Sequence, residues 1–159
     1  MLALSRWTIL ASLNKMDDFS ARLLVFRVAD LMAAVEATTV REILASQAAT
    51  RIPGAPAAVQ GLINVRGELV TLLRGRALLG REEADAEGGT LVLMRWGNAG
   101  VAIAVDEVVD LIPAGDAELT TRDDLPGIDA TLVRAVGVHA GRSFLVLDLD
   151  ALFRSLLAA

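Results

Sequence analysis

Two apolar arms on either side of a short glycine turn, within residues 61–80, constrain the fold of this chain more than any other segment. Arg66 and Gly67 lie between the arms, whose apolar residues are Leu62, Ile63 and Val65, then Leu69, Val70, Leu72 and Leu73. Because glycine readily adopts the positive φ that a tight hairpin demands, the segment predicts a β-hairpin that turns at Gly67. Arg66 is then a guanidinium at the end of a rigid hairpin, either presented to a partner or simply solvated in a turn.

The same pattern occurs a second time, with Gly141 in the place of Gly67. The matching positions are Val59 with Val133, Val70 with Phe144, Leu73 with Leu147, Ala77 with Ala151, Leu78 with Leu152, segment 24–26 with 92–94, and segment 40–43 with 108–111. Each half therefore contains two apolar strands, a long connection, a hairpin and a short tail. An internal repeat of this kind predicts two similar β subdomains, about residues 20–85 and 86–155.

Length and composition fit a compact soluble protein. A chain of 159 residues is ordinarily one domain, or two small ones that share a core. No apolar run approaches the roughly 18 residues of a membrane span. The chain has no cysteine, which excludes disulfides and thiolate chemistry and fits a reducing compartment. A net charge of −5, with arginines scattered singly, argues against nucleic-acid binding, which needs a basic stripe.

The first 19 residues differ from the rest of the chain, and we interpret them as an N-terminal extension. Their apolar stretch, residues 7–13, is short for a signal peptide and lacks a good cleavage site. Met16 is an alternative start, followed by two aspartates. We therefore expect the domain to occupy residues 20–155.

Outside the two hairpins, apolar runs predict strands at 23–28, 33–37, 40–44, 91–96, 101–105, 108–112 and 144–149. The last of these is apolar enough to be buried on both faces. Asp150 is expected to cap a final helix, Ala151 to Leu157, by accepting backbone N–H bonds.

Reactive side chains are scarce, which argues against an enzyme. His139 is the only histidine and is expected beside Gly141 in the second hairpin, so neither a familiar zinc site nor a Ser-His-Asp arrangement is indicated. Asp148 and Asp150 share a face of an extended chain, which permits acid–base or metal chemistry but also ordinary strand-end and helix-cap contacts. No glycine-rich phosphate loop is present. The sequence thus favours a binding module without catalytic residues, metal or cofactor, because β surfaces recognise partners by strand addition or apolar grooves.

Five segments, in order along the chain, resemble the CheW family of chemotaxis adaptors. The hairpin segment looks like the family's hallmark, and its motif residues are Gly61, Asn64, Arg66 and Gly67. The other four are the opening strand 24–26, the Val-x-Glu-Ile signature at 40–43, a Val-Asp-Glu-Val segment within 101–108, and the closing strand and helix at 144–152. Together they cover about residues 20 to 155.

The resemblance implies an all-β fold with two SH3-like five-stranded β-barrels packed side by side and a short C-terminal helix. It also implies a non-catalytic scaffold that couples chemoreceptors to a CheA-type histidine kinase in signal transduction. The cytoplasmic tip of the receptor would dock in the groove between the barrels. The regulatory domain of the kinase, which has the same fold, would join through barrel contacts that build arrays. Such a protein is cytoplasmic, reaches membrane receptor arrays through its partners, and neither inserts into the membrane nor binds nucleic acid.

By position, the residues that the resemblance associates with receptor docking are Val40, Glu42, Ile43 and Arg66. Apolar Val40 and Ile43 would meet a helix face, while the two charges would fix its orientation. Val40 and Ile43 also fit an ordinary strand core. The residues that would bind the kinase remain unknown.

The chain departs from the family at Thr71 and Arg74, where proline and aspartate are usual. The second half keeps an aspartate, Asp148, at the place equivalent to Arg74. The reversed charge puts the identity of the partner in question. Two alternatives therefore stay open: a regulatory CheW-like domain with a diverged or self-assembling role that is not tied to a standard kinase, and, more remotely, a metal-assisted hydrolase that uses Asp148 and Asp150.

Overall fold

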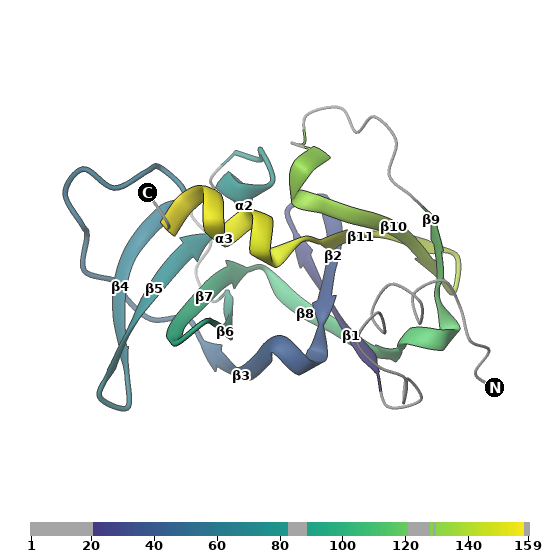
Figure 1. The fold of residues 1–159 in the computed structure, drawn as a ribbon, viewed down its shortest axis with the longest axis horizontal. Coiled ribbons are helices and arrows are strands. Elements are labelled where there is room, and N and C mark those ends of the chain that lie inside the picture. Colours follow the sequence, from purple (N-terminus) through teal and green to yellow (C-terminus); the bar gives the residue numbers. More distant parts are fainter. Residues whose placement is uncertain (1–20, 83–88, 121–127, 129, 158–159) are drawn as a thin grey trace.

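The computed structural model describes residues 21–82, 89–120, 128 and 130–157. The expected N-terminal extension, residues 1–19, lies outside this part of the chain. The described residues form two β-sheets that lie side by side, with a C-terminal helix that crosses above one of them (Figure 1). The predicted all-β fold with a short C-terminal helix is confirmed.

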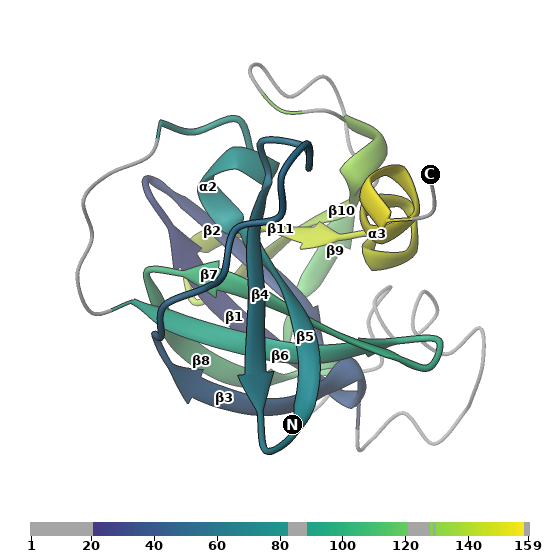
Figure 2. The same ribbon diagram turned by 90° about the vertical axis from the view of Figure 1, so that its left-hand side faces the viewer.

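The five-stranded sheet, which we call barrel one, has the strand order β3-β6-β7-β5-β4. Its strands are β3 (Val40–Ala45), β4 (Val59–Val65), β5 (Glu68–Arg74), β6 (Thr90–Trp96) and β7 (Ala99–Val105). All neighbouring pairs are antiparallel except β5 and β7, which run parallel with Leu72 opposite Ala102. An isolated antiparallel bridge joins Thr50, after β3, to Leu62 of β4, so the two edges of the sheet approach each other (Figure 2).

The second sheet, barrel two, has the order β8-β1-β2-β11-β10-β9. Its strands are β1 (Arg22–Val28), β2 (Leu31–Glu36), β8 (Glu107–Pro113), β9 (Glu118–Thr120), β10 (Val133–His139) and β11 (Arg142–Leu147). It also contains one parallel pair, β2 with β11. The sheet has six strands rather than the expected five because the three-residue strand β9 pairs with β10 at one edge.

The two sheets do not correspond to the two halves of the chain. We expected subdomains at about 20–85 and 86–155, but strand pairing places the hairpin β1–β2 in barrel two and the hairpin β6–β7 in barrel one. The repeat itself matches the topology, since β3, β6–β7 and β4–β5 occupy the positions of β8, β1–β2 and β10–β11. Each half has therefore exchanged its first hairpin with the other. Local sequence patterns do not record which distant strand a hairpin joins, so the expected boundary was wrong.

Three apolar clusters fill the described part of the molecule. One lies within barrel one and one within barrel two, and each is built only from segments of its own barrel. The third and largest contains residues of both barrels and of the C-terminal helix, including Leu24, Leu73, Met94, Leu147 and Phe153. Strands such as β1 and β6 face two clusters at once, which explains why their apolar runs are continuous rather than alternating.

The C-terminal helix α3 (Leu149–Leu157) begins two residues earlier than expected. Its cap is Asp148, whose Oδ1 accepts the N–H of Ala151 at 3.1 Å, and not Asp150 as the sequence suggested. Phe153 is buried and packs against Trp96 of β6 with ring centroids 6.0 Å apart, so α3 leaves barrel two and fastens onto barrel one. The remaining helical segments are α2 (Gly75–Leu78), η3 (Ala37–Thr39), η4 (Ala114–Asp116) and η5 (Ala130–Leu132). Among the helices within the described residues, none has the length and apolar character to cross a bilayer.

Asp106 joins the two barrels where the chain crosses from β7 to β8. Its Oδ2 accepts hydrogen bonds from Arg27 of barrel two (3.2 Å), from Arg76 of α2 (2.8 Å) and from the N–H of Ala29 (2.8 Å). The side chain of Asp106 is 13% exposed, so these charge-assisted bonds are partly shielded from water. One carboxylate therefore connects elements on both sides of the junction.

Candidate functional site

The tip of the β4–β5 hairpin has the geometry of a two-residue turn. Arg66 and Gly67 both have positive φ, at 50° and 89°, which a type I′ turn requires. The N–H of Gly67 also donates to Oδ1 of Asn64 at 2.8 Å, which holds the turn in place. The predicted turn at Gly67 is confirmed, and Arg66 adopts a backbone conformation that few non-glycine residues take.

Gly61 has a different role in this hairpin. It stands where Thr50 exchanges two backbone hydrogen bonds with Leu62, each 2.8 Å long. A Cβ at position 61 would clash with the carbonyl oxygen of Thr50. Gly61 is thus the residue that lets the two edges of barrel one come together.

The guanidinium of Arg66 is paired with Glu42 of β3. Nη1 donates to Oε2 at 3.1 Å, and Nη2 donates to Oε1, so the pair is bidentate. The hydrogen bond from Arg66 holds the pKa of Glu42 below its usual value, and the same bond raises the pKa of Arg66. Arg66 remains 66% exposed, so the guanidinium is oriented by Glu42 yet still open to a partner.

A second charge pair lies beside the first. Arg41 Nη1 is 3.3 Å from Glu68 Oε1, at the start of β5. The two pairs join β3 to the hairpin tip with alternating signs, Arg41 and Glu42 on one side, Arg66 and Glu68 on the other. Sequence analysis named Glu42 and Arg66 but did not predict their contact, and it missed Arg41 and Glu68.

Val40 and Ile43, on the same strand, have different environments. Val40 is half-buried and packs against the cluster between the barrels, which fits a core role. Ile43 is 46% exposed, which is unusual for a large apolar side chain in the middle of a strand. The irregular pairing between Val40 and Glu42, a β-bulge at Arg41, places Val40 opposite Met94 and Ile43 opposite Val92, so both side chains lie on the face of the sheet that meets the cluster between the barrels.

Further apolar residues lie on the side of β1 and β8 that faces the cluster between the barrels. Leu111, 49% exposed, is directly opposite Leu24 in the β1–β8 ladder. Directly opposite residues share a face of the sheet, so Leu111 lies on the side of Leu24. Val40 and Val108 pack against the cluster that contains Leu24. We use the name junction surface for the set Val40, Glu42, Ile43, Arg66, Val108 and Leu111.

The two departures from the family pattern lie in β5, away from the turn. Thr71 is half-buried in the middle of the sheet, opposite Leu62 and Val101. Arg74 donates from Nη1 to the carbonyl oxygens of Ala57 (2.7 Å) and Val59 (3.3 Å). The reversed charge at position 74 thus contacts the loop that precedes β4 rather than the charge pairs at the hairpin tip.

The acidic pair Asp148 and Asp150 belongs to the start of α3. Asp148 caps the helix, while Asp150 accepts hydrogen bonds from Arg154 (2.6 Å) and from Trp96 Nε1 (3.2 Å). The bond from Arg154, and then that from Trp96, lower the pKa of Asp150. Within the described residues, no three His, Cys, Asp or Glu side chains gather closely enough to hold a metal ion. His139 lies next to the second hairpin turn as predicted, and its Nδ1 is 3.3 Å from the carbonyl oxygen of Asp116.

Comparison with known proteins gives a consistent result. A family model described as a CheW-like domain matches residues 22–157. A chemotaxis protein CheW of Rhizobium meliloti (strain 1021) is 30% identical over 135 residues, which are 84% of this chain and 87% of that protein. A chemotaxis protein CheW of Treponema pallidum (strain Nichols) is 27% identical over 146 residues, 87% of this chain and 85% of that protein. The crystal structure of the scaffolding protein TtCheW from Thermoanaerobacter tengcongensis superimposes with a TM-score of 0.75 at 19% identity, covering 84% of this chain and 87% of that one.

Proposed function

Because this chain belongs to the CheW family, we propose that it is a non-catalytic scaffold that couples chemoreceptors to a CheA-type histidine kinase. Its place would be in the cytoplasm, at receptor arrays that it reaches through its partners. The curated relatives are named as chemotaxis proteins, which supports the pathway. The receptor and kinase contacts are our inference from the surface of this chain.

The observation that carries the receptor contact is the oriented guanidinium of Arg66 beside exposed apolar side chains. Ile43 and Leu111 are 46% and 49% exposed. Ile43 is on the same strand as Val40, and Leu111 is opposite Leu24; both Val40 and Leu24 pack between the barrels. An apolar helix face can bury such side chains, while a charged pair at the edge of the contact fixes its orientation. We therefore place the receptor tip on the junction surface.

The kinase contact is less constrained. Leu69, next to the hairpin tip, is 64% exposed and is the most exposed of the large apolar side chains in the described residues. Since Arg74 is engaged with the backbone of the preceding loop, its reversed charge need not prevent a contact at the barrel end. We propose that the regulatory domain of the kinase binds this chain through a barrel, without assigning residues.

Isothermal titration calorimetry with two ligands tests the proposal: the regulatory domain of a CheA-type kinase, and a cytoplasmic receptor fragment that includes the tip. We expect saturable one-to-one binding to the kinase domain. Arg66→Ala should lower the affinity for the receptor fragment and leave the affinity for the kinase domain unchanged. Arg51→Ala, at an exposed arginine in the loop after β3, is the matched control. A folded protein that binds neither ligand would overturn the scaffold proposal.

The remote hydrolase alternative requires Asp148 and Asp150 to share a metal. Asp148 caps a helix and Asp150 is held by Arg154 and Trp96, so both carboxylates already have structural partners. These contacts favour the helix-cap interpretation, and the hydrolase is not proposed.

A further inference from the structure

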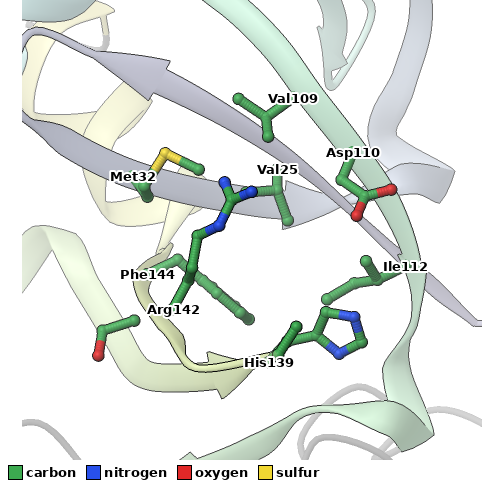
Figure 3. Close-up of a pocket in the computed structure, with 10 residues that line it drawn as sticks. Val25, Met32, Val109, Asp110, Ile112, His139, Arg142 and Phe144 are labelled. Atoms are coloured by element: carbon green, nitrogen blue, oxygen red, sulfur yellow. The ribbon is translucent and has the colours of Figure 1, made fainter.

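A pocket opens at one end of barrel two, on the side of β1 that faces the interior of this barrel (Figure 3). Its floor is apolar: Val25, Ile112 and Phe144 are each at most 5% exposed, and Met32 and Val109 are half-buried. Its cavity volume, about 80 Å³, is well below that of a site for a drug-sized molecule, so the pocket suits a ligand with one small apolar group. The junction surface uses none of these residues, so this pocket is separate from the proposed receptor contact.

A β-bulge builds one wall of the pocket. In the β1–β8 ladder Val25 is opposite Asp110 and Phe26 is opposite Val108, so Val109 is an extra residue in β8. Because of this extra residue, the neighbours Val109 and Asp110 both line the pocket instead of pointing to opposite faces. Bulges of this kind commonly re-aim side chains toward functional sites.

The rim carries one positive and one negative side chain that do not neutralise each other. Figure 3 shows the guanidinium of Arg142 over the pocket beside Val25 and Met32, with the carboxylate of Asp110 at the β8 side. Within the described part of the chain, neither forms an ion pair. Asp110 Oδ1 accepts the N–H of its neighbour Leu111, at 2.8 Å. His139 completes the rim, with Nδ1 directed to the carbonyl oxygen of Asp116.

An apolar floor lies between a guanidinium and a carboxylate that have no ion-pair partner among the described residues, and this combination selects a particular chemistry. A simple apolar acid would bind Arg142 but face repulsion from Asp110, and a simple apolar amine would have the opposite difficulty. A molecule with both charges and an apolar body satisfies the rim and the floor together. We propose that this pocket binds a free apolar α-amino acid, with its carboxylate on Arg142, its ammonium group on Asp110 and its side chain against Phe144 and Val109.

NMR titration of the full chain with L-leucine tests this assignment. We expect saturable, millimolar binding with shift changes at residues 109–112 and 139–144 and none at Arg66. N-acetyl-L-leucine lacks the ammonium group and L-leucinamide lacks the carboxylate. Each should bind about tenfold more weakly, as expected for loss of one charge-assisted hydrogen bond.

Variants separate the two charges. Arg142→Gln should lower the affinity for leucine about tenfold but leave the weaker affinity for leucinamide unchanged. Asp110→Asn should lower the affinity for leucine but not the affinity for N-acetyl-leucine. Arg95→Gln and Glu118→Gln, exposed charges outside the pocket, should bind leucine like the wild type.

Three results would overturn the proposal. The first is the absence of saturable shift changes with leucine, and the second is equal binding of wild type and Arg142→Gln. In the third, N-acetyl-leucine binds as tightly as leucine, which would reassign the pocket to apolar carboxylates, such as the C-terminal residue of a protein. Because Arg142 and Asp110 are exposed, the variants are expected to fold, and their amide spectra check this directly.

Discussion

Arg66 donates to both carboxylate oxygens of Glu42, although 24 residues separate them in the chain. The pair connects the edge strand β3 with the hairpin tip on the opposite edge of barrel one. It gives Arg66 a fixed direction while leaving it largely exposed. A residue that is only solvated in a turn has no such constraint.

Arg66→Ala should therefore fold like the wild type and lose affinity for a receptor tip. The side chain lies at a turn and contributes little to any apolar cluster, so thermal unfolding should change little. Affinity for the receptor fragment, measured by calorimetry, should fall, while Arg51→Ala should leave it intact. Unfolding of Arg66→Ala, or unaltered receptor binding, would contradict the assignment of the junction surface.

Exchanging the charges of Glu42 and Arg66 tests whether the receptor recognises the guanidinium at position 66 or needs only the ion pair that links β3 to the hairpin. Glu42→Arg and Arg66→Glu alone should each weaken receptor binding, since each places two like charges side by side. The double variant restores an ion pair with reversed polarity. If the receptor reads the guanidinium at position 66 itself, the double variant should stay weak even though its stability recovers. Full recovery of binding would show instead that only the connection between β3 and the hairpin matters.

The free energy of unfolding should depend on pH in the acid range partly through Glu42. The bond from Arg66 lowers the pKa of Glu42 in the folded state, so folding favours the ionised form. This stabilisation is present above the unfolded pKa and is lost as the pH falls through the lowered folded value. The stability difference between wild type and Glu42→Gln should therefore shrink in acid, as measured by urea unfolding at several pH values. In an NMR titration the pKa of Glu42 should rise in Arg66→Ala, and an unchanged value there would contradict the pairing.

The hairpin tip is the part of the fold that the sequence predicts best. Its apolar arms and Gly67 are local signals, and the structure places the turn at that glycine. The role of Gly61 carries no comparable signal, because Thr50 becomes its neighbour only when the barrel edges meet. The helix cap shows the same limit on a smaller scale: Asp148 and Asp150 are both suitable caps, but Asp148 caps the helix while Asp150 accepts from Trp96, which is distant in the chain.

The pairing of the hairpins is the part that no local pattern could supply. Parallel contacts such as Leu72 with Ala102, and Val146 with Ala34, join segments far apart in the chain. Hydrophobic periodicity tells which residues face a core but not which core they face. The same reason applies to Arg41 and Glu42 of β3, because their partners lie in the distant β4–β5 hairpin.

Asp106 should be among the most sensitive polar positions for stability. Asp106→Ala leaves Arg27 and Arg76 without their shared acceptor at the junction of the barrels, and we expect a loss of about 2–4 kcal/mol. Glu107→Gln is the matched control, because Glu107 is 59% exposed and reaches Arg27 only at 3.5 Å. It should lose less than about 1 kcal/mol. Chemical denaturation measures both, and equal effects would mean that Asp106 does not connect the barrels.

Gly61→Ala should destabilise the protein more than a glycine change at an open turn. The added Cβ meets backbone atoms of Thr50, which cannot move without breaking the Thr50–Leu62 bridge. We expect a loss of more than about 2 kcal/mol. Gly97→Ala also forces an alanine to positive φ but meets no atom, so its loss should be about 1 kcal/mol. A similar loss in both variants, by urea unfolding, would contradict the close approach at Gly61.

The exchange of hairpins has a consequence for the order in which this protein can be completed during synthesis. Barrel one needs β7, so it cannot close until the chain has been made as far as Val105. The hairpin β1–β2, which is made first, pairs with β11 and must wait until Leu147 has emerged. The first hairpin of the described residues thus gains β8 beside β1 but lacks a neighbour for β2 until the last strand is made, so a product truncated before β11 leaves the edge of β2 unpaired for the quality-control machinery of the cell to recognise.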